Sequence, residues 1–569
     1  MDGVVWVGAQ DAGEVDAIDA NTGRITSYKF GHELTTVAAG AGTVMIGVNR
    51  SPDEIIAGVE GNVLHIATTT EFLQAPAPDP ATNPYAYNRM LLYATCSRLL
   101  AYGDAGGAES YNLRPEVAAA MPEVSPDGLT YTFSIKPGFG FSPPSTEPLT
   151  AETYRYSIER ALSAELDEIG LPRAIQYLDD IVGAADYHDG KADHVSGLQA
   201  LDDKLVITLA APSPTFLQRL MLPFSCPVPL GTPAVPNLDP SPPIPNSGPY
   251  YLLRHGGGEY AILERNPNYG GTRHGPYDAI TFKFALANGE TVRWVDDGRA
   301  DIAIGDPVLQ AGQDLANRWG PESEAAAAGH ERWYGISYPG VDYLAINPHS
   351  AFLADATSRR AIALALDRTA AAQGFYEIPA TSLLDDAFQV RDQPIDELIG
   401  PDAAGAAQLL GGRTGTIRYV TITDCDECVD IANSIKANLI GAGITLEIVQ
   451  DQNPIDFAND PRNKIDVIGN YGQPFYPDAP TLLEEIGSLT PPSWVSDEQT
   501  ARLAAILEMS GDERNQAAAG FAHDLVAEGL LIPYGYPVDG VYFGDGVGCR
   551  TIISGIMNLD LVALCPGSP

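Results

Sequence analysis

The strongest candidate for chemistry is the cysteine pair in Cys425-Asp-Glu-Cys428, which lies between a predicted strand and a predicted helix. A thiol at the start of a helix has a lowered pKa, and paired cysteines at this spacing occur in redox enzymes and metal sites. Asp426 and Glu427 argue against such chemistry, because negative charge beside a thiolate raises its pKa. A zinc site would need two further ligands, and no second pair at zinc-finger spacing is present. The motif therefore allows three interpretations: a structural disulfide, inert thiols, or redox or metal chemistry.

Other catalytic motifs are absent from the sequence. Gly40-Ala-Gly42 and Gly256-Gly-Gly258 lack the strand, helix and acidic residue that surround a dinucleotide site, and no GxxxxGK[ST] or G-x-S-x-G motif occurs. The nine histidines are scattered without H-x-x-x-H spacing. We therefore expect a protein that is not an enzyme, with no catalytic residues, no cofactor and no metal.

The composition is strongly acidic. Lys and Arg number 33 against 74 Asp and Glu, which gives a formal charge of −41 in 569 residues. Such a field repels phosphate backbones, so nucleic acid is excluded as the expected partner. The acidity fits solubility or a salty habitat; attraction of cationic ligands is the alternative, and it would need a focused cleft.

Neither a membrane span nor an export signal is visible in the sequence. No run of eighteen apolar residues occurs, and the first residues, Met1-Asp-Gly-Val-Val-Trp, lack both a basic and an apolar region. The length favours two to four domains, because single cores stop growing at roughly 250–300 residues.

Two consecutive segments predict a hairpin followed by a capped helix. Asp127-Gly128 is a turn dipeptide, and apolar residues then alternate with polar ones from Leu129 to Ile135, as in a half-buried strand. Thr150 is placed to cap a helix whose apolar stripe recurs every four residues from Tyr154. Farther along, helices and strands alternate, as in an α/β lobe. The expected elements are a helix at 357–369, a strand at 415–423, a helix at 428–442, and strands at 444–449 and 464–469.

The amino-acid sequence of these segments, 122–136 and 148–160, resembles a segment near the start of the extracytoplasmic solute-binding proteins of peptide-type ATP-binding-cassette importers, called family 5. Further landmarks occur in the family's order: Gly61–Ala67, Leu91–Tyr102, Asn246–Leu252, Leu263–Tyr269, Tyr343–Asn347, Arg359–Arg368 and Tyr476–Asp478. The resemblance covers about residues 60 to 569. It implies an α/β, two-lobed periplasmic-binding-protein-like fold of type II with an extra insertion lobe, whose lobes close around a ligand by hinge motion.

The domain boundaries that this resemblance implies start at residue 61. Lobe I would contain 61–90, 236–335 and 531–569, the insertion lobe 91–235, and lobe II 336–530. Residues 1–60 are different: three short strands and the turn Asn21-Thr-Gly23 resemble one blade of a β-propeller. Because one blade cannot close a ring, we expect the chain to start inside a longer polypeptide. The alternative is a β-extension packed on the binding domain.

Six cysteines in an exported protein indicate disulfides, and six cysteines allow fifteen connectivities. Chain order and the resemblance favour Cys96 with Cys226, Cys425 with Cys428, and Cys549 with Cys565. In a cytosolic protein all six would be free.

The resemblance places the ligand at a cleft, and the loop 470–478 follows the strand that precedes the cleft in relatives. Relatives often hold there an aromatic residue and an aspartate for the peptide amine. In this chain Gln473-Pro474 follows the glycine and Asp478 comes later. It is therefore ambiguous whether Asp478 occupies the position of the relatives' aspartate. The predicted ligand-binding residues are Tyr343, Asn347, Asn470, Tyr471, Tyr476 and Asp478; ordinary core or loop packing is the alternative for each.

The family implies an importer component, a monomer that binds an oligopeptide or similar polar solute and delivers it to ABC permease subunits in the membrane. It also implies an extracytoplasmic location, which the chain would reach through an anchor or export segment absent from this sequence. The alternative is a ligand-sensing domain of a larger propeller-containing regulatory protein. A thiol oxidoreductase centred on Cys425 and Cys428 is a third possibility.

Overall fold

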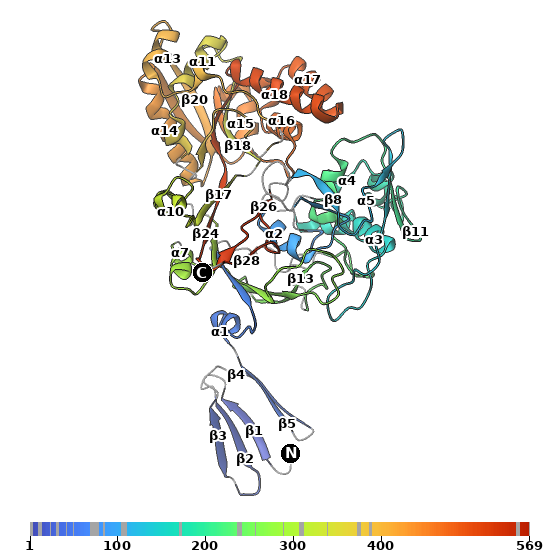
Figure 1. Cartoon of the computed structure of the whole chain (residues 1–569). Coiled ribbons are helices and arrows are strands. Elements are labelled where there is room, and N and C mark those ends of the chain that lie inside the picture. Colours follow the sequence, from blue (N-terminus) through green and yellow to red (C-terminus); the bar gives the residue numbers. More distant parts are fainter. Residues whose placement is uncertain are drawn as a thin grey trace.

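The computed structural model describes residues 4–567 except 10–13, 23, 30–33, 41–42, 49, 69–78, 83–85, 104–110, 170–172, 236–241, 257, 288, 306–311, 338, 373–376, 386–387, 389 and 554–557. The chain forms two α/β lobes, a third lobe inserted beside the first, and a small group of N-terminal strands (Figure 1). Within the described residues, no helix combines the length and the hydropathy needed to span a bilayer.

Lobe I is built on a seven-stranded sheet in which β6 runs parallel to its neighbours β15 and β16, while the remaining pairs are antiparallel. In spatial order the strands are β13 (Tyr250–Gly256), β14 (Tyr260–Arg265), β15 (Ala279–Lys283), β6 (Val63–Thr68), β16 (Ile302–Ile304), β24 (Val538–Phe543) and β17 (Trp333–Ser337). The helices of this lobe are α1 (Pro52–Ala57), α2 (Ala86–Thr95), α7 (Glu290–Asp296), α9 (Gly312–Trp319) and α10 (Glu324–Ala327). Its core contains Leu64, Phe282 and Ile302, all fully buried.

Lobe II is built on a six-stranded mixed sheet. In spatial order the strands are β19 (Ile378–Pro379), β23 (Leu531–Tyr536), β18 (Val341–Ile346), β22 (Val467–Gly472), β20 (Gly415–Ile422) and β21 (Ile444–Asp451). The helices are α11 (Ala356–Ala365), α12 (Arg368–Ala372), α13 (Ala403–Leu409), α14 (Asp426–Ile440), α15 (Pro454–Asn459), α16 (Ala479–Ser488), α17 (Asp497–Glu508) and α18 (Gly511–Ala527). Two separate buried clusters contain Leu344 and Tyr343, which are neighbours on β18, so the sheet is covered on both faces.

The insertion lobe confirms the predicted hairpin and helix. Its four-stranded antiparallel sheet has the order β11 (Leu198–Leu201), β12 (Lys204–Thr208), β10 (Thr130–Ser134) and β9 (Glu123–Val124). Gly128 has φ of 73° in the turn, and Tyr131 and Phe133 point into the core. The side chain of Thr150 caps α3 (Ala151–Ala161) by accepting a hydrogen bond from the Thr153 amide. The lobe also contains α4 (Ile175–Leu178), α5 (Ala184–His188), α6 (Phe216–Arg219) and the hairpin of β7 (Leu100–Tyr102) with β8 (Leu113–Pro115).

Two segments pass between lobe I and lobe II. One joins β17 to β18, and the other, at Pro537, joins β23 to β24. The expected boundary at residue 531 is therefore wrong for β23, which pairs with β18 of lobe II before the chain returns to lobe I. β23 continues almost directly into β24, which belongs to the other sheet. The sequence pattern does not show where the chain passes from one sheet to the other. The expected boundary at residue 91 also falls inside α2, which continues to Thr95.

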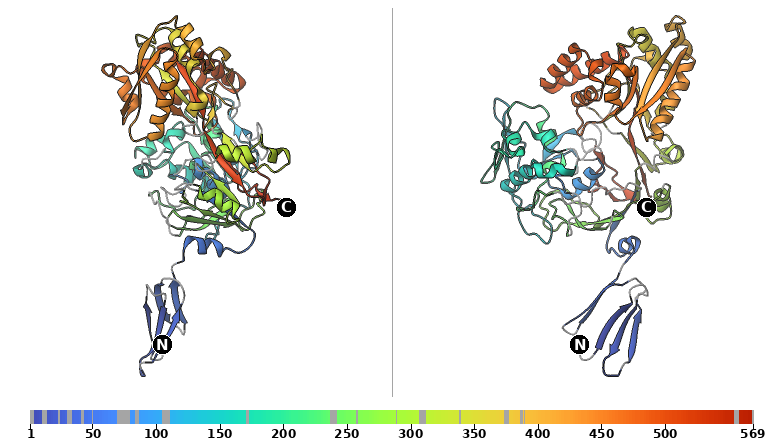
Figure 2. Two further views of the ribbon diagram at one scale, coloured as in Figure 1. Left: turned by 90° about the vertical axis from the view of Figure 1, so that its left-hand side faces the viewer. Right: turned by 180° about the vertical axis from the view of Figure 1, so that it is seen from behind.

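The N-terminal strands project away from the lobes and are joined to them through α1 (Figure 2). β1 (Val4–Ala9), β2 (Glu14–Asp19) and β3 (Ile25–Lys29) form an antiparallel sheet, and β4 (Leu34–Gly40) pairs with β5 (Thr43–Val48). These antiparallel strands agree with the predicted β-structure. Their assignment to a propeller stays a prediction.

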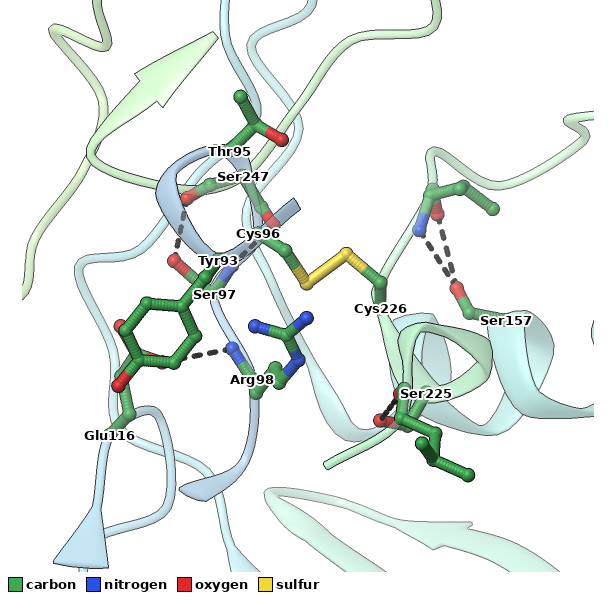
Figure 3. Close-up of a disulfide and its surroundings, with 12 residues drawn as sticks. Tyr93, Thr95, Cys96, Ser97, Arg98, Glu116, Ser157, Ser225, Cys226 and Ser247 are labelled. Carbon is green, nitrogen blue, oxygen red and sulfur yellow. Dashed lines mark hydrogen bonds between the residues drawn. A yellow bond between two sulfur atoms is a disulfide. The ribbon is translucent and has the colours of Figure 1, made fainter. Parts of the chain in front are cut away.

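All six cysteines are paired as expected. Disulfides join Cys96 to Cys226, Cys425 to Cys428, and Cys549 to Cys565. Figure 3 shows the first of them, which links the segment after α2 to the segment after α6 across 130 residues. The last lies beside the small C-terminal pairs of β25 (Val547–Gly548) with β28 (Cys565–Pro566) and β26 (Ile552–Ile553) with β27 (Asn558–Leu559).

Candidate functional site

The candidate site lies where lobe II meets lobe I and the insertion lobe. β18 and β22 are antiparallel, with Val341 opposite Gly472, so the start of β18 and the end of β22 are at the same edge, beside the interlobe segments. Gly340 marks the closest approach: a Cβ there would lie 2.9 Å from the Gly472 carbonyl oxygen and 3.3 Å from the Pro537 ring. Only glycine allows the two interlobe segments and the end of β22 to pack this closely.

The loop 473–478 leaves β22 and contacts both other lobes. The ring of Phe475 meets Tyr177 of the insertion lobe edge-on, with centroids 5.5 Å apart. The Arg89 guanidinium of α2 lies 5.4 Å from the same ring, in a cation–π contact. Tyr476 is 6% exposed and belongs to the buried cluster of the insertion lobe. An aromatic pair on one loop therefore bridges the three lobes.

Tyr471 is the exposed aromatic residue at this edge of lobe II. It is 38% exposed, and both partial burial and nearby carboxylates raise the pKa of its hydroxyl. Its cross-strand neighbour is Asp342, whose carboxyl is hydrogen-bonded to Glu377 and accepts a hydrogen bond of 3.4 Å from Tyr534. Burial raises the pKa of both carboxyls, and repulsion from Asp342 raises that of Glu377 further. The pair therefore holds a proton at neutral pH.

Asp478 is the N-cap of α16, and its carboxylate is fully hydrogen-bonded within the protein. Its Oδ2 accepts hydrogen bonds from the Thr481 amide at 3.1 Å and the Thr481 hydroxyl at 2.7 Å. Its two oxygens also form a bidentate ion pair with Arg514 of α18, the Nη2–Oδ2 distance being 2.9 Å. Both side chains are buried, at 5% exposure for Arg514 and 11% for Asp478. A ligand amine would have to compete with this ion pair.

The remaining predicted residues occupy different places in lobe II. Tyr343 is fully buried in the core beneath α16. Asn470 donates a 2.6 Å hydrogen bond to the Leu489 carbonyl. Asn347 follows the opposite end of β18, where it donates to the Ile465 carbonyl and lines a cavity of about 650 Å³. Of the six predicted residues, the structure thus brings Tyr471, Tyr476 and Asp478 to the interlobe region.

Sequence reasoning missed the residues that meet this loop from the other lobes. Arg89 is separated from Phe475 by almost four hundred residues, and Tyr177 belongs to the insertion lobe. Phe475 lies inside the predicted loop 470–478, so its aromatic character was the available signal. No such signal marked Arg514 in the sequence, because arginine side chains are mostly exposed in folded proteins.

For the Cys425 and Cys428 pair the structure favours the interpretation as a structural disulfide, because the two sulfur atoms are bonded to each other. Cys425 is the N-cap of α14, as the strand-to-helix position predicted. Among the residues that the structure describes, no group of three or more His, Cys, Asp or Glu side chains could hold a metal ion.

Comparison with known proteins gives a family match over most of the chain. Residues 112–493, about two thirds of the sequence, match the model of the bacterial extracellular solute-binding proteins, family 5 Middle. Protein XP55 of Streptomyces lividans is 30% identical over 231 residues, which cover 38% of this chain and 38% of that protein. The matched region thus spans well under half of that relative.

Solved structures show the same fold at low sequence identity. The unliganded open form of the periplasmic murein tripeptide binding protein MppA is 19% identical, with a TM-score of 0.72 over 89% of this chain and 97% of that chain. OppA of Haemophilus influenzae, in complex with RPPGFSPFR, is also 19% identical, with a TM-score of 0.61 over 90% of this chain and all of that chain. These likenesses confirm the two-lobed α/β fold.

Proposed function

The chain belongs to the bacterial extracellular solute-binding proteins of family 5, and from this premise we propose that it is the solute-binding component of an ATP-binding-cassette importer. It binds a short peptide, or a similar small polar solute, between its lobes and delivers it to permease subunits in the membrane. It works outside the cytoplasm and carries out no covalent chemistry on its ligand.

The observation that carries this proposal is the junction of the lobes. Two chain segments connect lobe I to lobe II, and they meet at Gly340 and Pro537, where little side-chain volume separates them. A pair of connections at one edge favours hinge bending, in which the opposite edges approach each other. The loop 473–478 lies beside this junction, so a ligand held there would contact several lobes at once and stabilise the closed arrangement.

The printed names of similar structures support a peptide as the ligand. MppA is named for a murein tripeptide, OppA of Haemophilus influenzae is in complex with RPPGFSPFR, and DppA of Helicobacter pylori is in complex with the peptide STSA. Peptide recognition uses main-chain hydrogen bonds and aromatic contacts, and Tyr471 offers an exposed aromatic ring at the proposed site. Tyr471 and the loop 473–478 are therefore the part of lobe II that we assign to the ligand.

Isothermal titration of the full chain tests the proposal. A panel of peptides of two to nine residues is titrated beside free amino acids, sugars and nickel. We expect saturable binding of at least one peptide, with a 1:1 ratio, and weaker binding by Tyr471→Ala. Exposed Tyr28 of the N-terminal sheet provides a matched control, because Tyr28→Ala removes an exposed tyrosine far from the lobes. Binding of the sugars or nickel but of no peptide would overturn the peptide assignment.

A further inference from the structure

A small cavity separates the insertion lobe from lobe II beside the proposed site. Its volume is about 190 Å³. Tyr102 and Gln218 line it from the insertion lobe, and Asp478, Arg514 and Asn515 line it from lobe II. In Figure 1, α16 and α18 lie on the side of lobe II that is nearest to the insertion lobe. Because pockets for whole small ligands usually measure about 300–1,000 Å³, this cavity is suited to one side chain of a larger ligand.

The charged groups in the cavity wall already neutralise each other. Asp478 and Arg514 form the bidentate ion pair described above, and the Asp478 carboxylate accepts two more hydrogen bonds from Thr481. A charged ligand group entering this cavity would lose its hydration without meeting a free counter-charge. Such a transfer is strongly unfavourable, so the wall selects against ammonium and carboxylate groups.

Among the described lining residues, the Nε–H of Arg514 is buried without a hydrogen-bond partner, and the other groups left open for bonding are neutral. Gln218 of α6 and Asn515 of α18 are both half-buried, and in the described part of the chain neither carboxamide has a hydrogen-bond partner. The Tyr102 side chain is buried, and burial raises the pKa of its hydroxyl, which therefore stays protonated. Two carboxamides and a phenol offer both donors and acceptors, and an apolar ligand group would leave them unpaired.

We propose that this cavity is a selectivity subsite that takes an uncharged hydrogen-bonding side chain of the peptide, such as a carboxamide or a hydroxyl. The inference rests on the proposed function. Gln218 and Asn515 belong to different lobes, so a side chain bound by both favours their approach. The subsite thereby couples recognition of one ligand side chain to closure.

The test uses a peptide that binds the full chain and replaces each of its residues in turn by Gln, Glu, Lys or Leu. At one position we expect the Gln peptide to bind about 3–10 times more tightly than the Leu peptide, as expected for one or two hydrogen bonds. The Glu and Lys peptides should bind no better than the Leu peptide. The double variant Gln218→Leu with Asn515→Leu should lose the preference for Gln while keeping its affinity for the Leu peptide, which shows that it is folded.

Gln516→Leu is the matched control, since Gln516 is the exposed neighbour of Asn515 on α18 and does not line the cavity. It should retain the full preference for Gln. If peptides bind without any preference for Gln, or if the double variant keeps the preference, the subsite is refuted and the proposed function stands. If no peptide of the panel binds, the subsite and the peptide assignment of the proposed function are both refuted.

Discussion

Replacing Asp478 by asparagine separates a structural role from a ligand-binding role for this carboxylate. The side chain of the Asp478→Asn variant would still cap α16, because asparagine accepts a hydrogen bond from the Thr481 amide as well as aspartate does. The substitution would leave the Arg514 guanidinium, which is 5% exposed, without its ion-pair partner. Loss of one partner from a buried pair costs about 3–5 kcal/mol, so Asp478→Asn should lower the free energy of unfolding by that amount.

The partner variant and the double variant complete the cycle. Arg514→Met leaves a carboxylate that still accepts two hydrogen bonds from Thr481, so we expect a smaller loss of about 2–3 kcal/mol. The double variant should lose less than the sum of both single variants, with a coupling energy of about 2–3 kcal/mol.

Urea unfolding followed by circular dichroism measures these losses, and titration with a bound peptide measures affinity. Arg502→Met is the matched control: Arg502 pairs with Asp524 at 2.7 Å, but the two side chains are 44% and 51% exposed. Such a surface pair should contribute at most about 1 kcal/mol. The reasoning is refuted if Asp478→Asn leaves the unfolding midpoint unchanged while peptide affinity falls, because the carboxylate would then serve the ligand.

Three further predictions concern stability and the lobe junction. Burial and repulsion from Asp342 raise the pKa of Glu377, so above the ordinary pKa of a glutamate the folded protein binds more protons than the unfolded chain and its stability falls with rising pH. Glu377→Gln, which cannot ionise beside Asp342, should reduce this slope by up to about 1.4 kcal/mol per pH unit in unfolding curves. Loss of the disulfide in Cys96→Ala with Cys226→Ala should lower stability by up to about 5 kcal/mol, since it closes a loop of 130 residues. Gly340→Ala, whose Cβ would lie 2.9 Å from a carbonyl oxygen, should cost about 1–3 kcal/mol and weaken peptide binding.

The glycine and disulfide predictions each have a control in the same chain. Gly546→Ala adds a Cβ with nothing within 4 Å and should change neither stability nor binding. Removal of the Cys425–Cys428 disulfide, which closes a loop of three residues, should cost much less than removal of the long-range disulfide, about 1.6 kcal/mol in the same chain-entropy relation. An unchanged pH slope in the Glu377 variant would show that the buried pair does not hold the proton assigned to it.

The sequence predicted features that depend on neighbouring residues. The turn at Asp127-Gly128, the alternation that buries Tyr131 and Phe133, and the cap at Thr150 are confirmed because each depends on interactions within a few residues. The three disulfides are also confirmed, with the long-range pair supplied by the family resemblance.

Most of the site depends on tertiary structure, which the sequence pattern did not predict. Tyr343 and Tyr471 lie on adjacent strands, yet one is buried beneath α16 and the other is exposed at the sheet edge. That outcome depends on register and on which face each helix covers. The partner of Asp478 lies 36 residues later, and Arg89 reaches Phe475 from another lobe. No local pattern marks these contacts.

Native mass spectrometry of the full chain tests the central claim most directly. The protein is measured as purified and again after incubation with a library of short peptides. The account predicts a single non-covalent adduct with the mass of a peptide, exchangeable with added peptide and lost when the protein is unfolded. Absence of any peptide adduct in both samples, from protein shown to be folded, would contradict it.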